Sequence, residues 1–315
     1  MTPVTDRVTD RAARVHTEHV RRLASLDPSV HLPDLDLSAD HHEVLLAPDG
    51  EAVAVVEAQH TDPASTPGLW VDEDVHRVQV RCTAAAGPTA LTELLARAAT
   101  VLGGDRPAHL VVASRDLALP RPLLKAGYAP ATVLALHRLE APPLFADDAT
   151  DDGVVVRSAV PDDVEAVVAA SVAVQAHDSA VGVLPDRPGA AEVFWPSVET
   201  ALRERPDWCW VAERAGLVVG ICEMEPPEVA DWVTGAVSPP PDGSTTAYLA
   251  LLHVAAGERG KGVGAALVRT AHARAVEAGA GQVVLHHAAT NPLSVPFWGR
   301  AGYRPLLTGW ARFPA

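Results

Sequence analysis

Arg259-Gly260-Lys261-Gly262-Val263-Gly264 is the stretch that decides the fold of this 315-residue chain. It follows an apolar segment from Tyr248 to Val254, which predicts a strand, and precedes a helix predicted from about Gly264 to Ala278. Three glycines let the backbone approach a ligand without Cβ clashes, and free N–H groups beside a helix N-terminus form an anion site. With the charges of Arg259 and Lys261, the loop predicts a phosphate-bearing ligand, and a tight structural turn is the alternative.

The segments around this loop predict a mixed α/β domain over residues 154–315. Val154 to Val156 has strand character, and Pro161 opens a helix. Two apolar runs separated by Arg214-Ala215-Gly216, Trp208 to Glu213 and Leu217 to Met224, predict a hairpin. A proline-rich loop near the site is expected from Glu225 to Ser244. Beyond the glycine loop we expect a strand over Gln282 to His287 and a short helix starting at Pro296.

The first half of the chain, residues 1–140, repeats this order. Its elements are a hairpin turn at Asp49-Gly50, a strand from Val75 to Cys82, and a helix with Leu91, Leu94, Leu95, Ala98, Val101 and Leu102 on one face. Lys125-Ala-Gly-Tyr-Ala-Pro130 parallels Arg300-Ala-Gly-Tyr-Arg-Pro305 at an offset of 175 residues. The same offset pairs Asp116 with Asn291 and Leu110 with Leu285. We therefore favour an internal duplication.

The two copies differ at the decisive loop. The first copy has Thr83-Ala-Ala-Ala-Gly-Pro-Thr-Ala90 there, with one glycine, no positive charge and a proline that removes a donor. We expect the first copy to be degenerate and non-catalytic. Residues 141–153, rich in proline and aspartate, predict a solvated linker between domains 1–140 and 154–315.

Composition excludes several classes of function. Hydrophobic residues make up 48% of the chain and charged residues 21%, as in globular proteins. No apolar run is long enough to span a membrane, and the net charge of −15 argues against nucleic acid as a partner. The three cysteines are too scattered for a disulfide framework or a zinc site, so no metal is expected. A cytoplasmic protein is predicted, and its acidic surface mildly favours a cationic substrate.

A second pattern lies downstream of the loop: Asn291, Ser294, Phe297-Trp298 and Gly302-Tyr303. Together the two patterns resemble the GNAT superfamily of acyl-CoA-dependent N-acyltransferases. The resemblance covers roughly Val154 to Arg312 and, more weakly, the first half.

The resemblance implies the fold and the cofactor. Each copy would be a mixed, mostly antiparallel sheet flanked by helices, an α/β (α+β) class, with the fourth and fifth strands splayed apart. Acetyl-CoA would be the acyl donor. Its pantetheine arm would pair with Leu252, His253 and Val254 and meet Asn291, with Ser294 and Trp298 nearby. Its pyrophosphate would lie on the N–H groups from Arg259 to Gly264.

The groups that move protons are less clear from the sequence, because Trp298 stands where many members of this superfamily have a tyrosine acid. Indole gives up no proton at useful pH. Candidates for acid, base or substrate orientation are Tyr248, His286, His287 and Glu223. Strand alternation places residues 248, 250, 252 and 254 on one face and the two histidines on opposite faces. Glu223 shares a face with Glu225. The alternatives are packed aromatics, core or surface histidines and solvated carboxylates.

Four tryptophans are candidates for an acceptor pocket, with core packing as the alternative: Trp195, Trp208, Trp210 and Trp232. The sequence as a whole predicts a tandem protein whose second copy moves an acetyl group from acetyl-CoA to a primary amine of a small molecule, by direct attack in a ternary complex. The rivals are another acyl donor or a hydroxyl acceptor, and a CoA-binding sensor without catalysis.

Overall fold

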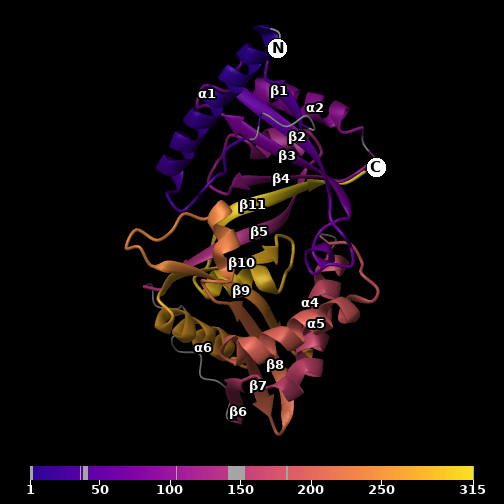
Figure 1. The fold of residues 1–315 in the computed structure, drawn as a ribbon, viewed down its shortest axis with the longest axis vertical. Coiled ribbons are helices and arrows are strands. Elements are labelled where there is room, and N and C mark those ends of the chain that lie inside the picture. Colours follow the sequence, from indigo (N-terminus) through magenta and orange to yellow (C-terminus); the bar gives the residue numbers. More distant parts are fainter. Residues whose placement is uncertain are drawn as a thin grey trace.

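The computed structural model describes residues 3–35, 37, 42–103, 105–140, 153–181 and 184–314, and Figure 1 shows their arrangement. Its strands form one sheet in the order β1-β2-β3-β4-β11-β5-β10-β9-β8-β7-β6. The sheet runs the length of the molecule, from β1 at the top of Figure 1 to β6 at the bottom. The predicted linker lies outside the described residues, apart from Gly153.

The elements of the first half are α1 (Pro3–Leu26), β1 (His42–Leu46), β2 (Ala52–His60), β3 (Asp74–Cys82), α2 (Pro88–Val101), β4 (Ala108–Ala113), α3 (Pro120–Lys125) and β5 (Ala129–Arg138). Those of the second half are β6 (Val154–Ser158), α4 (Val164–Ala180), α5 (Ala190–Glu204), β7 (Cys209–Arg214), β8 (Leu217–Glu225), β9 (Thr245–Val254), α6 (Val263–Glu277), β10 (Ala280–Ala288), α7 (Ser294–Arg300) and β11 (Arg304–Arg312). Short 3₁₀ helices include η4 (Ala230–Gly235) and η5 (Ala256–Glu258).

The mixed α/β class and the tandem architecture predicted from the sequence are confirmed, but the two halves share one sheet. Each half gives its last strand to the other: β11 pairs with β4 of the first half, and β5 pairs with β10 of the second. The two exchanged strands pair with each other at the centre. The two halves on either side of the linker therefore share one continuous sheet.

Strand registers show that the halves are related by a pseudo-two-fold axis. Ala108 pairs with Arg312, and His137 pairs with Val283. The 175-residue offset relates Ala108 to Val283 and His137 to Arg312, so it converts one pair into the other. Under the same offset the central pair Val133–Thr308 maps onto itself, which places the axis there. This symmetry of register supports the duplication inferred from sequence.

Helices cover both faces of the sheet and bury its apolar side chains. In the second half α6 packs Leu267, Val268 and Ala271 against one face, while α4 and α5 pack Val168, Phe194 and others against the opposite face. Each buried Val, Leu or Phe side chain contributes about 1.5–3 kcal/mol. Helix α6 lies where the sequence predicts it, whereas α1 and α5 were not predicted. Among the described residues, no helix is long and apolar enough to cross a membrane.

The halves are also tied together away from the central strands. Asp27, just after α1, is almost fully buried and accepts hydrogen bonds from both terminal nitrogens of Arg304 on β11, at 2.6 and 3.0 Å. Val30 forms an isolated bridge with Val237, just beyond η4. The segment after α1 and the proline-rich loop of the second half therefore meet over the middle of the sheet.

Both copies contain a wedge between two parallel strands. The pairing of β9 with β10 ends at Tyr248–Val284, and that of β3 with β4 ends at Arg77–His109. Since Val284 and His109 are related by the 175-residue offset, the strands part at equivalent places. The splay implied by the family resemblance is thus present twice.

Candidate functional site

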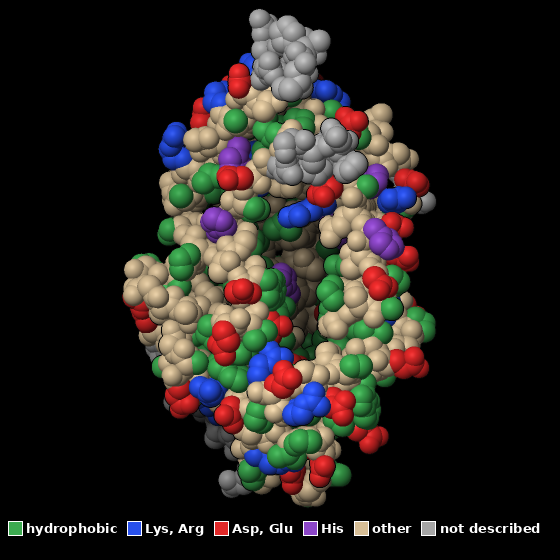
Figure 2. Space-filling view, viewed as in Figure 1, with side chains coloured by type: hydrophobic (Ala, Val, Ile, Leu, Met, Phe, Trp, Pro, Cys, Tyr) green, Lys and Arg blue, Asp and Glu red, His purple; other side chains and the backbone are tan. Residues whose placement is uncertain are grey.

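The wedge of the second copy holds a cavity of about 670 Å³. The end of α4, residues 249–254 of β9, the glycine loop, the start of α6, the end of β10 and α7 all line it. Figure 2 shows that one face of the molecule is deeply hollowed at its centre, over the middle strands of the sheet, with a histidine side chain visible inside. A cavity of this size suits a cofactor or drug-sized ligand.

The glycine loop forms one end of this cavity. Gly260 and Gly262 have φ of +77° and +79°, a left-handed conformation that residues with a Cβ rarely adopt. Gly262 is the N-cap of α6, so the first N–H groups of the helix lack intrahelical acceptors. Gly264 has no room for a side chain, because a Cβ there would lie 3.2 Å from the Phe297 ring.

The charged residues of the loop differ in position. Arg259 lines the cavity, and its Nε donates to the carbonyl of Val254 at 3.0 Å. Lys261 is exposed and does not line the cavity, and its Nζ pairs at 3.3 Å with Glu258, a carboxylate that does line it. Glu258 also accepts from Arg214. The loop therefore keeps backbone N–H groups and one guanidinium beside the cavity.

A β-bulge in β9 corrects the expected side-chain alternation. Glu223 pairs with Leu251 and Met224 with Leu249, which leaves Ala250 as the extra residue. Leu249 and Leu252 both pack under α6, whereas Leu251 packs under α4 and α5. The prediction that residues 248, 250, 252 and 254 share one face is wrong, because an extra residue reverses the alternation beyond it.

Asn291 lines the cavity at the end of β10 and is nearly buried. Its Oδ1 accepts from the backbone N–H groups of Leu293 and Ser294, and its Nδ2 donates to Asp178 at 3.3 Å. The amide thus fixes the turn into α7 and links it to α4. Ser294 also lines the cavity, and its Oγ is buried without a hydrogen-bond partner in the described structure.

Trp298 forms part of the wall, 6% exposed, and packs edge-on against Phe297 and Tyr303. Tyr303 lies behind it in the core, where its hydroxyl meets His272 Nε2 at 2.7 Å. Burial raises the pKa of the Tyr303 phenol well above its usual value. The position of Trp298 therefore carries no titratable group, as the sequence indicated.

Two of the four catalytic candidates meet in one cluster. Tyr248 Oη lies 3.1 Å from His286 Nδ1, and His286 lines the cavity. Trp232 of η4 packs edge-on against Tyr248 with 4.9 Å between ring centroids, and its Nε1–H donates to Glu225 Oε2 at 2.9 Å. The proline-rich loop thus lies beside the site, as predicted.

The pKa shifts in this cluster have a common cause. Desolvation, followed by the effect of neighbouring His287, lowers the pKa of His286 to about 4. Desolvation, followed by the charge of Glu225, raises the pKa of Tyr248 well above its usual value. At neutral pH the imidazole is therefore uncharged and the phenol keeps its proton.

The other two candidates lie apart from this cluster. His287 lines the cavity, and desolvation lowers its pKa, offset in part by its hydrogen bond to the Ala288 carbonyl and by the charge of Asp178 on α4. Glu223 is half-buried beside Leu251 and is not among the lining residues. Burial, followed by the charge of Glu225, raises its pKa. Glu223 is therefore less favourably placed than the histidines.

Sequence reasoning missed the contribution of α4. His177 and Asp178 line the cavity, and His177 Nε2 lies 3.4 Å from Asn291 Oδ1. Desolvation raises the pKa of Asp178. No local motif marks these residues, because they reach the wedge only when α4 packs across the sheet. Of the tryptophans, Trp208 and Trp210 are buried in the core, Trp195 is exposed on α5, and Trp232 alone joins the cluster.

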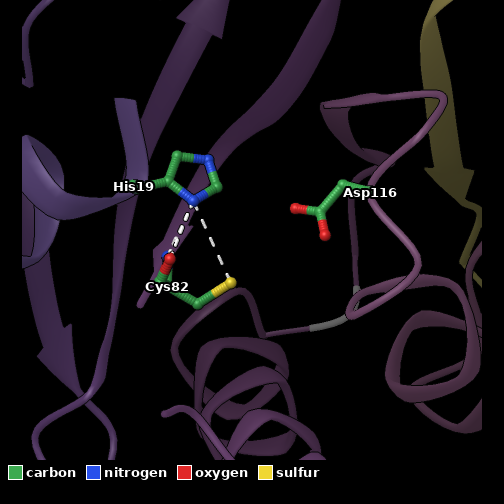
Figure 3. A group of neighbouring side chains, drawn as sticks. All are labelled: His19, Cys82 and Asp116. Atoms are coloured by element: carbon green, nitrogen blue, oxygen red, sulfur yellow. Dashed lines mark hydrogen bonds between the residues drawn. The ribbon is translucent and has the colours of Figure 1, made fainter. Parts of the chain in front are cut away.

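Side chains from α1 fill part of the wedge of the first copy. Figure 3 shows His19, Cys82 and Asp116 gathered from α1, β3 and the turn after β4, with His19 hydrogen-bonded to Cys82. These three offer atoms within 4.8 Å of one another, a spacing that suits a metal ion. A guanidinium nitrogen already lies among them: Arg22 Nη2 is 2.6 Å from Asp116, 3.1 Å from His19 and 3.3 Å from Cys82. The cluster is therefore a packed ion pair.

Comparison with known proteins bears on the second copy most directly. Residues 178–303 match the family model described as Acetyltransferase (GNAT) family. A search among curated proteins gave no match.

Solved structures are similar over nearly the whole chain. A GCN5-related N-acetyltransferase from Sphaerobacter thermophilus has 17% identity and a TM-score of 0.59, covering 97% of this chain and 93% of that one. A tandem GNAT protein from the clavulanic acid biosynthesis pathway has 12% identity and a TM-score of 0.45, covering 98% and 96%. At these identities the similarity concerns the fold alone. Of the two structures, the Sphaerobacter thermophilus protein, with its TM-score of 0.59, supports the fold assignment.

Proposed function

Because the second half of this chain belongs to the acetyltransferase (GNAT) family, we propose that its wedge binds acetyl-CoA and transfers the acetyl group to a primary amine of a small molecule. The observation that carries this proposal is the 670 Å³ cavity that ends at the glycine loop and the N-terminus of α6. An anionic pyrophosphate suits the N–H groups there, and Arg259 adds a positive charge. The thioester arm would lie between β9 and β10.

The bulge at Ala250 gives β9 a role in the reaction. A bulge residue leaves the regular strand ladder, so its neighbourhood has backbone groups free for a ligand. N–H groups at this point would polarise the thioester carbonyl and stabilise the oxyanion that forms during attack. The β3 strand pairs with β2 without any such shift.

His286 is the residue we propose as base. It is solvent-exposed, it lines the cavity, and Tyr248 Oη lies 3.1 Å from its Nδ1. The imidazole would take a proton from the acceptor ammonium, directly or through water, and release it to solvent. The amine nitrogen then attacks the thioester carbon, the C–S bond breaks, and the nitrogen loses its second proton as the CoA sulfur gains one.

Acetyl-CoA binding by calorimetry tests the cofactor site. We expect Gly262→Glu to weaken binding at least about 100-fold, since it places a carboxylate and a Cβ where the pyrophosphate would lie. Gly189→Glu is the matched control: Gly189 is the N-cap of α5, with φ of +85° against +79° at Gly262, and has open space around it. No binding to the native chain, or equal loss in both variants, would refute the site.

A panel of primary amines tests the transfer reaction by measuring CoA release. Turnover with an amine, and its loss in Gly262→Glu but not in Gly189→Glu, is the expected result. Acetyl-CoA binding without turnover of any amine would instead identify a CoA-binding module, which the tryptophan at position 298 in place of an acid favours.

A further inference from the structure

A second cavity lies on the first copy, in a region where no sequence motif predicts a site. Its volume is about 290 Å³, and its walls come from β2, β3, β4, the segment after α1 and the end of η4. Arg77 and Val111 on its wall occupy the places that Tyr248 and His286 hold in the second copy, because the wedges start at equivalent register positions. The cavity is therefore the counterpart of the region around Tyr248 and His286 in the second copy.

Arg81 is the unusual residue of this cavity. Only 3% of its surface is exposed to solvent. Its terminal nitrogens donate to the carbonyls of Val80 and Pro33 and to Gln79 Oε1, and its Nε has no hydrogen-bond partner. Neutral oxygens accept these bonds, and within the described part of the chain no carboxylate forms an ion pair with Arg81. A buried charge without a counterion is costly, so such groups normally have a partner.

A second guanidinium adds to the positive charge. Arg77, two residues along the same face of β3 from Gln79, is exposed and lines the cavity with Arg81. Glu57 lies opposite Arg77 in the β2–β3 register and is not on the cavity wall. Burial, followed by the nearby charge of Arg77, lowers the pKa of Arg81 to about 10. In a chain with net charge −15, this concentration of positive charge in a cavity stands out.

We propose that this cavity binds the carboxylate or phosphate group of a small molecule, held by Arg81 in the interior and Arg77 at the mouth. A guanidinium with an unused Nε–H recognises planar or tetrahedral oxyanions, and a bound anion would supply the counter-charge that Arg81 lacks. Apolar wall residues such as Val111 and Leu307 leave room for an uncharged body beside the anionic group. The site needs no acetyl-CoA and is independent of the function proposed for the second copy.

Titration with inorganic phosphate, and separately with acetate, tests the proposal at constant ionic strength. The readout is the side-chain Nε–H resonance of arginine in ¹⁵N-labelled protein. We expect the Arg81 signal to shift with saturation while that of Arg121, exposed on α3, stays in place. Preference for phosphate or for acetate shows which oxyanion the site takes.

Two variants decide whether Arg77 and Arg81 form the site. Arg77→Gln changes an exposed side chain and should weaken binding about tenfold, the value of one charge-assisted contact. Arg121→Gln, the same change outside the cavity, should leave it unaltered. The proposal is overturned if the Arg81 signal does not move with either anion, or if both variants bind equally well. Arg81→Lys, which keeps the charge and loses the fork, should also bind more weakly.

Discussion

The two wedges of this molecule start from the same register and end in different states. In the second copy β9 and β10 part around a 670 Å³ cavity. In the first copy β3 and β4 part at the equivalent place, where Arg22, His19 and Asp116 fill the part beneath α1 and leave a smaller cavity of about 290 Å³. Splayed strands are thus a property of the fold. The room left between them for a ligand depends on which side chains the covering helix places there.

Equivalent residues show how the difference arises. Asp116 and Asn291 each accept a hydrogen bond from the N–H two residues on, so both fix the turn after their strand. The remaining contact differs: Asp116 binds a guanidinium from α1, and Asn291 donates to a carboxylate on α4. The first copy also lacks both the bulge and the glycine loop. Three local changes therefore separate the partly filled wedge of the first copy from the larger cavity of the second.

Breaking the ion pair of the first copy should produce the largest effect. Arg22→Ala leaves Asp116 buried and unpaired, which we expect to lower the free energy of unfolding by about 3–5 kcal/mol. The double variant Arg22→Met/Asp116→Asn removes both charges and should recover most of that loss. Urea unfolding measures both, and equal stability of the single and double variants would contradict the ion-pair interpretation.

The proposed base of the second copy can be separated from its neighbour. His286→Gln should lower kcat/KM for acetyl transfer about 100-fold or more, as removal of a general base does, with acetyl-CoA affinity unchanged. His287→Gln serves as the control on the same strand. If His287→Gln has the larger effect, the base is His287 paired with Asp178, and the assignment to His286 is wrong.

Acid should destabilise both copies through buried neutral histidines. Burial lowers the pKa of His19 to about 4 and that of His272 to about 3. The unfolded chain binds these protons below its ordinary pKa of about 6.5, so stability is complete above that pH and falls as pH decreases. At pH 5.5 each histidine should cost about 1.4 kcal/mol relative to pH 7.5.

Urea unfolding at these two pH values checks this expectation. His19→Gln and His272→Gln should each reduce the loss of stability between pH 7.5 and 5.5, and the double variant should reduce it further. A loss that is the same in the variants and in the native chain would show that other groups control acid stability.

The smallest effect is expected from replacing Asn291 by the residue that the first copy has at the equivalent position, Asp116. Asn291 Nδ2 lies 3.3 Å from Asp178 Oδ1, so Asn291→Asp places a carboxylate beside Asp178. In the first copy the equivalent Asp116 lies beside a guanidinium instead. Two adjacent carboxylates should lower stability by about 1 kcal/mol at neutral pH and raise the pKa of one of them. The loss should shrink as pH decreases toward 5. If the difference in unfolding free energy between this variant and the native chain is independent of pH in this range, position 291 does not contact Asp178.

Much of this site was predictable from short segments. The glycine loop and the helix that follows it lie where the sequence placed them, and His286 and Asn291 line the predicted wedge. Prediction failed where one inserted residue mattered: Ala250 adds a bulge to β9, and the faces of Leu252 and Val254 reverse relative to Tyr248. A single extra residue leaves no signal in hydrophobic periodicity, because the strand is apolar on both faces.

Sequence by itself determined the features that depend on local backbone chemistry and on internal repetition. The positive φ at Gly260 and Gly262 favours glycine. The 175-residue offset that relates Asp116 to Asn291 can be read from the amino-acid sequence alone. Only the tertiary structure decided the exchange of β5 and β11, the insertion of Arg22 into one wedge, and the meeting of Trp232 with Tyr248 and His286. These contacts join residues far apart in the chain, and their partners are selected by how the sheet and its covering helices pack.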